Sequence, residues 1–444
     1  MDLKAFNNRL FERMAADEAA ESMYSSSSSF EVSVRDGEIL EYSVSDSMSL
    51  HFRMLSPSGR LGYATTQILD DEAVDMLVDG ARENAALVES KDRQFFHDGS
   101  GEYASLETYD PELEKIDAAA KIEMAKKLEK LTLEQDERIE KVDGCAIFYS
   151  SASGSMTNTL GLDISEKVNL LGGYVSAIAR DGEKVNTGFK SFFVKNPGDI
   201  DLEKVARDAA KDALSGLNAA SVPSGTYRIL LRNDMASTML STFSGIFSAD
   251  NAQRGLSQLK GREGEMVAAD CVTIMDDPHL EKGGASAAFD GDGVPTRVKK
   301  IVDGGKLTTL MHNLKTAHKQ GVETTGNASA GKGIAPSNFY FKPTDLSLEA
   351  MVEKTGDGLM ITHLMGMHSG ANAISGDFSL AARGFAIRGG KLVEPVDQIT
   401  IAGNFYTLLK DIEAVGGDLR FGFPGGSCYG SPCLLVKGLS VAGK

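Results

Sequence analysis

The sequence predicts an α+β protein with a mixed N-terminal region and a barrel-like β domain at its C-terminal end. Three observations support this class. The order helix, antiparallel strands, helix occurs twice before residue 220. From residue 272 onwards, short strands bounded by glycine dominate. The 444 residues include 47 glycines and only 11 prolines, which favours turns and strands over a helical bundle. We therefore expect an N-terminal α+β domain over residues 1–220 and a β-rich domain over residues 221–444.

The first half of the N-terminal domain covers about residues 1–105. It begins with an amphipathic helix, whose apolar stripe is formed by Leu3, Phe6, Leu10 and Met14. The serine run that follows is interpreted as the polar start of a strand, because it ends on an alternating segment. Strands are predicted at 30–34, 39–45, 48–54 and 62–66, and a second helix is predicted to start near Asp70.

The second half, about residues 106–220, repeats this plan. Asp110 and Pro111 open a helix with proline at its first position, and apolar spacing carries that helix to about Leu133. Strands are predicted at 139–149, 168–180 and 189–194, and a helix at 202–217 closes the unit. The two halves share element order without residue-level identity, so a duplication and a coincidence of order both remain open.

Residues 221–225 are expected to join the two domains. A short strand at 227–231 leads into a helix with Asp234 as its N-cap, and the apolar residues of that helix are Met239, Leu240, Phe243 and Phe247. Further strands are predicted at 297–302, 306–310, 338–342, 358–364, 385–388, 391–393, 398–401 and 433–441, with one helix at 405–415. Many short strands separated by turns suggest a closed, barrel-like domain.

Composition and charge exclude several function classes. The formal net charge of −17 repels a phosphate backbone, so we expect no direct binding of nucleic acid. Four cysteines in 444 residues do not form a disulfide framework. Charged residues interrupt the first apolar run, so no signal peptide is expected, and no stretch of 18 apolar residues predicts a membrane span. The cytoplasm is therefore the expected location.

Several segments resemble one known family. The central segment holds Arg254-Gly255, Ser257, Gly261 and Gly264-Glu265. A later block runs from Ser375-Gly376-Asp377-Phe378-Ser379 to Thr400-Ile401-Ala402-Gly403-Asn404. In order and spacing these segments resemble the TldD/PmbA family, historically called modulators of DNA gyrase. The resemblance covers nearly the whole chain.

One position within the resemblance separates two branches of the family. TldD-like peptidases carry an HExxxH zinc motif on the helix before the central segment, and an ungapped alignment places it on residues 240–245. Leu240 and Gly245 stand at the histidine positions, and Ser241 stands at the glutamate position. None of these side chains can bind zinc or act as a general base. The chain therefore resembles the other branch, PmbA (also called TldE).

The resemblance implies a fold and a setting. Members are cytoplasmic α+β proteins with a barrel-like C-terminal domain. TldD-like and PmbA-like chains pair as a heterodimer that acts as a zinc peptidase on unfolded or leader peptides. The TldD-like chain supplies zinc, whereas the PmbA-like chain supplies structure and part of the enclosing chamber. We thus expect no catalytic, cofactor or metal site in this chain, and a groove lined by Leu240, Ser241 and Gly245.

A second hypothesis remains open, in which the chain is a homodimeric peptidase with a metal site from other residues. Its candidates are His363, His368 and Cys433. The two histidines are five residues apart, so they lie on opposite faces of a strand unless a turn at Gly366 brings them together. Cys433 begins an apolar strand and is interpreted as a small buried hydrophobe. Cys428, in a glycine-rich loop, is separated from it by four residues, which is not the spacing of a CxxC metal site.

The remaining candidate residues are interpreted as structural. The segment 290–293 alternates aspartate and glycine like the start of a calcium loop, but Ile301 stands where such a loop has glutamate. We therefore expect a solvated hairpin turn there. No Walker A or dinucleotide-binding glycine pattern occurs. Among the other candidates, Cys145 and Cys271 are expected in the core, His51, His97 and His279 are expected to be exposed, and His312 and His318 are not expected to form a site.

Overall fold

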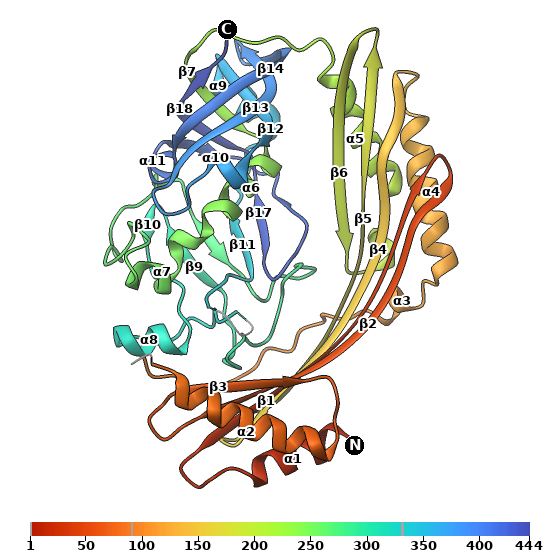
Figure 1. Ribbon diagram of the computed structural model, residues 1–444. Coiled ribbons are helices and arrows are strands. Elements are labelled where there is room, and N and C mark those ends of the chain that lie inside the picture. The colour runs from red at the N-terminus through yellow and green to blue at the C-terminus, as the bar shows by residue number, and fades with distance from the viewer. Residues whose placement is uncertain (1, 90–91, 330–332) are drawn as a thin grey trace.

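The computed structural model describes residues 2–89, 92–329 and 333–444. Two lobes face each other (Figure 1). One lobe is a long, curved sheet with helices along its outer face, and the other lobe combines a barrel with a second, smaller sheet. The first helix, α1 (Leu3–Glu12), lies at one end of the long sheet, and the C-terminal end of the chain lies at the far end of the barrel.

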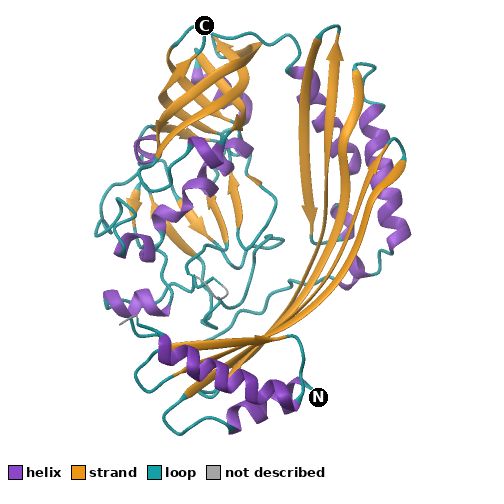
Figure 2. Cartoon of the chain, in the orientation of Figure 1, coloured by secondary structure: helices purple, strands orange, loops and turns teal. Residues whose placement is uncertain are grey.

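The long sheet has six antiparallel strands in the order β3-β2-β1-β4-β5-β6. These strands are β1 (Ala19–Arg35), β2 (Glu38–Leu55), β3 (Leu61–Thr66), β4 (Ile139–Asn158), β5 (Asp163–Asp181) and β6 (Lys184–Val194). Besides α1, the helices of this lobe are α2 (Asp71–Leu87), α3 (Pro111–Glu114), α4 (Ala118–Leu133) and α5 (Leu202–Ser215), with a 3₁₀ turn at Pro197–Asp199. The longer helices cover the outer face, and the opposite face is turned toward the barrel lobe (Figure 2).

The order helix, three strands, helix occurs twice in this lobe, in agreement with the repeat expected from the sequence. Both halves contribute to one sheet, because β1 pairs with β4 and places Phe30 opposite Tyr149. Two apolar clusters fill the space under the helices. One contains Phe6, Leu10, Leu50, Phe52 and Leu77, and the other contains Phe30, Val32, Leu128, Ile147 and Val175. The division of the chain near residue 220 stays a prediction.

Two strands predicted separately in the first half are one strand. The segments 39–45 and 48–54 both belong to β2, and the serine run lies inside β1. The polar stretch continues the ladder because serines face each other across it: Ser25 Oγ and Ser49 Oγ are 2.9 Å apart. Hydrogen bonds between side chains therefore keep this segment in one strand, where the sequence predicted two strands with a break between residues 45 and 48.

The barrel lobe contains a closed barrel of five strands in the order β14-β13-β12-β7-β18, with β14 paired to β18. The barrel strands are β7 (Gly225–Leu231), β12 (Gly358–Met365), β13 (Asp377–Arg388), β14 (Lys391–Asn404) and β18 (Leu434–Ala442), and β15 (Ile412–Val415) pairs with β18. The barrel-like domain expected from the sequence is confirmed.

A second sheet lies beside the barrel in the order β10-β9-β8-β11-β17-β16. Its strands are β8 (Ile274–Asp276), β9 (Lys299–Asp303), β10 (Lys306–Leu307), β11 (Asn338–Phe341), β16 (Arg420–Phe421) and β17 (Cys428–Ser431). The helices of this lobe are α6 (Asn233–Phe243), α7 (Ala249–Gln253), α8 (Leu314–Gln320), α9 (Leu348–Thr355), α10 (Met367–Gly370) and α11 (Phe405–Lys410), with a 3₁₀ turn at Ser244–Phe247. One apolar cluster joins barrel, sheet and α6, and it includes Phe243, Phe247, Phe339, Phe378 and Phe405.

Three local expectations are wrong. Asp234 does not cap α6, because the helix begins one residue earlier with Arg232 at its N-cap, and Asp234 pairs with Arg232 instead. The helix expected at 405–415 ends at Lys410, and the residues beyond it form β15 along the barrel. Cys271 lies exposed in a turn and not in a core strand.

We predict that Gly384→Ala strongly destabilises the barrel. A Cβ at Gly384 would overlap the backbone carbonyl of Met360 on the neighbouring strand, and backbone in a closed barrel has little room to move. Overpacking of this kind costs about 1–3 kcal/mol or more. Thermal unfolding followed by circular dichroism measures the effect. Gly426→Ala is the matched control, since nothing lies within 4 Å of its added Cβ, and equal melting temperatures for the two variants would contradict the prediction.

Candidate functional site at the junction of the two lobes

Two of the three positions expected to line a groove, Leu240 and Ser241, lie on α6, and the third, Gly245, lies in the 3₁₀ turn that follows it. Leu240 is 0% exposed and belongs to the apolar core, so it faces no open groove in this chain. Ser241 and Gly245 are half-buried. Asn251 Nδ2 donates to the carbonyl of Gly245 at 2.9 Å, and a Cβ on Gly245 would lie 3.2 Å from that same nitrogen. A larger side chain at this position therefore has to displace Asn251.

The chemistry of these positions does not fit zinc. A hydrocarbon, a hydroxyl and a hydrogen atom offer none of the nitrogen, thiolate or carboxylate ligands that zinc sites use. The neighbouring surface of α6 packs on β17 instead. Ser244 Oγ lies 3.0 Å from the hydroxyl of Tyr429, and Ser237 Oγ donates to the backbone carbonyl of Tyr429 at 2.9 Å.

The start of α6 is held by a buried network of ions that joins the two lobes. Arg232 Nη1 lies 3.0 Å from Asp212 Oδ1 on α5, and Arg232 Nη2 lies 2.6 Å from Asp234 Oδ2. Lys190 Nζ on β6 lies 2.5 Å from Asp212 Oδ2. The side chains of Lys190 and Asp212 are only 8% and 12% exposed. Burial by itself raises the pKa of Asp212, but Arg232 and Lys190 outweigh burial and lower that pKa.

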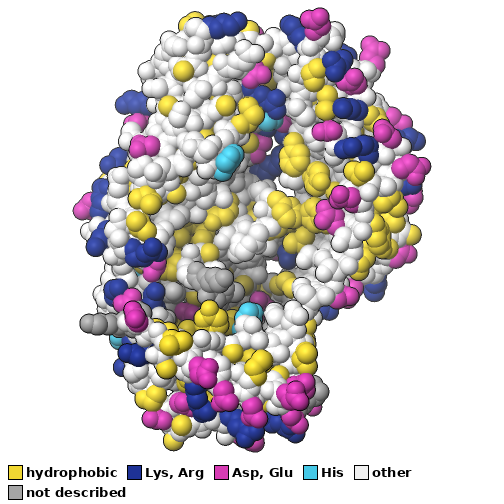
Figure 3. Space-filling model, in the orientation of Figure 1, with side chains coloured by type: hydrophobic (Ala, Val, Ile, Leu, Met, Phe, Trp, Pro, Cys, Tyr) yellow, Lys and Arg dark blue, Asp and Glu magenta, His cyan; other side chains and the backbone are white. Residues whose placement is uncertain are grey.

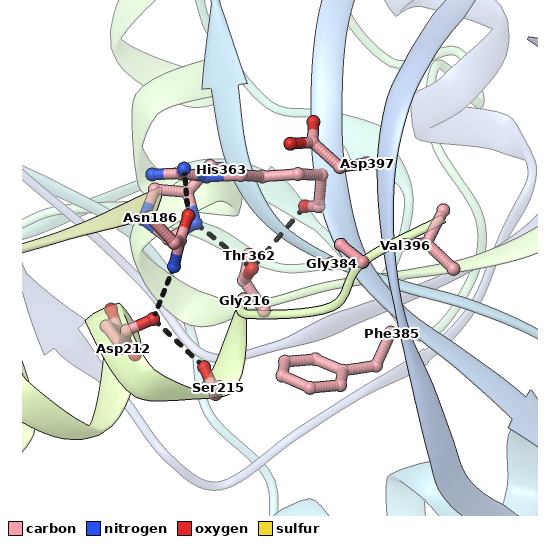
Figure 4. Close-up of a pocket in the computed structure, with 12 residues that line it drawn as sticks. Asn186, Asp212, Ser215, Gly216, Thr362, His363, Gly384, Phe385, Val396 and Asp397 are labelled. Atoms are coloured by element: carbon pink, nitrogen blue, oxygen red, sulfur yellow. Dashed lines mark hydrogen bonds between the residues drawn. The ribbon is translucent and has the colours of Figure 1, made fainter. Parts of the chain in front are cut away.

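Arg383 extends the network across the junction to Asn186, which Figure 4 shows beside Asp212. It lies on β13, and its Nη1 donates to Asn186 Oδ1 at 2.6 Å while its Nη2 donates to the carbonyl of Thr187 at 2.9 Å. Asn186 in turn donates to the carbonyls of Asp212 and Ala213 on α5. The space enclosed by these groups is about 10 Å³, which is room for a single water molecule at most. The junction is thus a packed polar contact and not a substrate pocket.

The structure does not bring together the candidates for an alternative metal site. His363 lines the junction on β12, where its Nδ1 lies 3.1 Å from the hydroxyl of Thr362. Gly366 makes the turn that would be needed, with φ 84°, but His368 lies beyond it on α10 and is exposed. Cys433 is 0% exposed in an apolar cluster with Leu230, Met360 and Leu435. Among the residues that the structure describes, no group of three or more His, Cys, Asp or Glu is placed to hold a metal ion.

Of the alternating aspartates of segment 290–293, Asp290 is buried and Asp292 is half-buried, so the solvated hairpin expected there is wrong. Asp290 accepts hydrogen bonds from the backbone N–H groups of Asp292, Val294 and Ala328 at 2.8–3.0 Å. Burial and the neighbouring Asp292 raise the pKa of Asp290 to about 7. The loop meets the segment between α2 and α3, where the hydroxyl of Tyr103 donates to the carbonyl of Gly293 at 2.9 Å. The loop that the carboxylate of Asp290 holds together therefore forms a second contact between the lobes.

Of the three histidines expected to be exposed, one is exposed and two are not. His51 is exposed, as expected, whereas His97 and His279 are half-buried. His97 Nε2 lies 2.8 Å from the carbonyl of Ser100, and His279 Nε2 lies 3.0 Å from the hydroxyl of Thr296. His312 is buried. Burial of these rings depends on packing between segments far apart in sequence, which isolated histidines in a sequence do not reveal.

Sequence reasoning missed a larger cavity of about 440 Å³ between the long sheet and the loops of the barrel lobe. Its two ionisable lining residues are Glu166 on β5 and Lys195 after β6. The only signal in the sequence is the alternation Glu166, Val168, Leu170, which places all three on one face of a strand. That alternation does not indicate which face meets the second lobe.

We predict that His363 makes folding sensitive to acid. Burial, and then Arg383 and Arg232, lower the pKa of His363 to about 4, whereas an unfolded histidine titrates near 6.5. The unfolded chain therefore binds a proton first, and stability falls as pH falls from 6.5 toward 4. Between pH 7 and pH 5, the free energy of unfolding should fall by about 1–2 kcal/mol less in His363→Gln than in the wild type, as measured by denaturant unfolding. The exposed His368→Gln is the control, and three identical pH slopes would contradict the prediction.

Three family models match the chain, namely PmbA/TldA metallopeptidase domain 1 over residues 20–85, its central domain over residues 111–217 and its C-terminal domain over residues 224–443. Among the described residues, no helix has the length and apolar character needed to cross a membrane.

Relatives and solved structures agree with the family models. A "Metalloprotease PmbA homolog" of Haemophilus influenzae is 30% identical over 373 residues, covering 81% of this chain and 79% of that protein. A "Metalloprotease" of Methanothermobacter thermautotrophicus is 32% identical over 282 residues, and the chain spans 61% of its length. A solved structure from Thermotoga maritima, described as a candidate modulator of a DNA gyrase, is 33% identical with a TM-score of 0.93, covering 99% of this chain and all of that one.

A further solved structure, TldE from Thermococcus kodakarensis, has 22% identity and a TM-score of 0.87 over 99% of this chain and 98% of that one. At that identity the likeness shows the fold alone. The three family models together cover most of the chain, from residue 20 to residue 443. The resemblance noticed in the sequence is therefore confirmed, and the chain belongs to the PmbA/TldD family.

Proposed function

We propose that this chain is a subunit of a PmbA/TldD-type zinc metallopeptidase, and that it encloses substrate without binding the metal. The observation that carries the proposal is the chemistry of α6. Leu240, Ser241 and Gly245 occupy the positions of the zinc motif and offer no zinc ligand, and Leu240 is buried in the core. Zinc would then come from a TldD-like partner chain.

The shape of the molecule supports an enclosing role. The inner face of the long sheet is turned toward the barrel lobe, and the surface between the lobes is hollowed, with hydrophobic side chains gathered around the hollow (Figure 3). In its middle this face carries small hydroxyl side chains, such as Ser27 and Ser47 on neighbouring strands. A floor of small polar groups beside apolar walls suits extended peptides of varied sequence, because it excludes few side chains. The proposed substrate is an unfolded or leader peptide.

An alternative function is a homodimeric peptidase that acts without a TldD-like chain. Its support is the naming of relatives as metalloproteases, including the Haemophilus protein. It requires a metal site from residues other than those of α6. His363, His368 and Cys433 are the residues that the sequence offered, and they lie apart in this chain. We therefore favour the subunit function, with a cytoplasmic location and no contact with nucleic acid or membrane.

We predict that the chain purified alone, without an affinity-tag histidine run, has a zinc content near zero by elemental analysis. It should not cleave an unfolded peptide by itself, and cleavage should appear when a TldD-like chain of the same organism is added. The control is the TldD-like chain with its two motif histidines replaced, which should leave the mixture inactive.

Two outcomes would overturn the proposal. About one zinc per chain would show a metal site that α6 does not provide, and His368→Ala and Cys433→Ala would then be the variants to test. Cleavage by the chain alone that a chelator abolishes would favour the homodimeric peptidase.

A further inference from the structure

The cavity between the lobes has the size of a small-molecule site. One wall is the inner face of the long sheet, where Ser150 on β4 lies opposite Leu170 on β5. The other wall is two loops of the barrel lobe, residues 284–287 and 423–426. The volume of about 440 Å³ lies within the range of about 300–1,000 Å³ that is typical of ligand sites.

Aromatic rings form the apolar side of the cavity. The ring of Phe423, at the tip of its loop, meets the ring of Phe148 edge to face with centroids 4.9 Å apart, and it lies 6.4 Å from the ring of Phe193. Phe423 nevertheless stays 47% exposed. Nothing lies within 4 Å of a Cβ added to Gly426, so the loop leaves open space beside the rings. An apolar ligand group could cover the exposed part of Phe423.

Lys195 places a cation in this cavity without a counter-ion. Its Nζ donates to the carbonyl of Asn169 at 3.0 Å and to the carbonyl of Thr108 at 3.4 Å. No carboxylate of the described residues forms an ion pair with it, and burial lowers its pKa. An ammonium group has three protons to donate, so one remains for a ligand. A partly buried cation without a partner is unfavourable, and a bound carboxylate would remove that cost.

Glu166 places an anion on the same wall. It projects from β5 on the face that carries Val168 and Leu170, and no hydrogen bond or ion pair joins it to another described residue. Burial raises its pKa. Glu166 is three residues along β5 from Asn169, whose carbonyl binds Lys195, and three residues of a strand span about 10 Å. This backbone span is about the length of an extended tripeptide.

We propose that this cavity binds a short zwitterionic peptide, whose carboxylate lies on Lys195, whose α-ammonium lies on Glu166 and whose apolar side chains cover Phe148 and Phe423. A ligand with one charge would leave the other half-buried charge unpaired, whereas a peptide with both ends free pairs both. This inference deepens the proposed function, because it names the ligand class that the enclosed space retains.

The test is isothermal titration calorimetry of the full chain at pH 7 with three forms of trileucine: both ends free, carboxyl end amidated, and amino end acetylated. We expect the free form to bind and each blocked form to bind at least about tenfold more weakly. Lys195→Met should weaken the free form to the level of the amide without weakening the amide further, and Glu166→Gln should do the same with respect to the acetylated form.

Two variants control for a change in folding. Lys195→Arg keeps the cation and should retain most of the affinity for the free form. Lys141→Met removes an exposed lysine of β4 and should change nothing. Equal affinity for all three peptides, no binding of the free form, or unchanged binding by Lys195→Met would each overturn the proposal.

These outcomes can be told apart from a failure of the proposed function. The titration uses this chain alone, whereas the peptidase assay needs a TldD-like chain. If the mixture with a TldD-like chain cleaves peptide but this chain binds no trileucine, the peptide site is rejected and the subunit function is retained. If this chain binds trileucine but the mixture is inactive, the subunit function is rejected and the peptide site is retained.

Discussion

The arrangement of the two lobes depends on the buried ions at the start of α6. Lys190 and Asp212 come from the N-terminal lobe, and Arg232 and Asp234 come from the barrel lobe. Each lobe holds one pair of its own, and Arg232 Nη1 joins the lobes through its contact with Asp212 Oδ1 at 3.0 Å. Breaking a buried contact between ions costs several kcal/mol, so this contact favours one relative position of the lobes. The width of the larger cavity depends on that position, because its two walls belong to different lobes.

Packing contacts fix α6 and the 3₁₀ turn that follows it. Leu240 lies in the core, and Ser237 of the helix and Ser244 of the turn contact Tyr429 on β17. Small hydroxyl groups allow helix and strand to approach closely, and Tyr429 satisfies them. The barrel and the apolar cluster around Phe243 and Phe405, whose rings stack with centroids 4.6 Å apart, stabilise this part of the fold.

Most elements of the fold could be predicted from local patterns. Amphipathic spacing located the helices of the N-terminal lobe, and short strands with glycine turns indicated the barrel. The errors occur where a contact across the sheet or between lobes overrides local preference. The polar stretch within β2 remains a strand because Ser25 and Ser49 bond across the ladder. Asp290 is buried although its sequence is typical of a solvated turn, because backbone N–H groups of its own loop and of Ala328 surround it.

The sequence by itself determined the family, the α+β class and the absence of zinc ligands at Leu240, Ser241 and Gly245, because these follow from which residues are present and in what order. Only the tertiary structure decided which charges meet. Lys and Glu are residue types that usually lie at the surface, and the local sequence around Lys195 and Glu166 does not show that both face one cavity. Strand pairing sets their distance and the opposing loops set their burial. Both are long-range contacts, which the periodicity of a single segment does not encode.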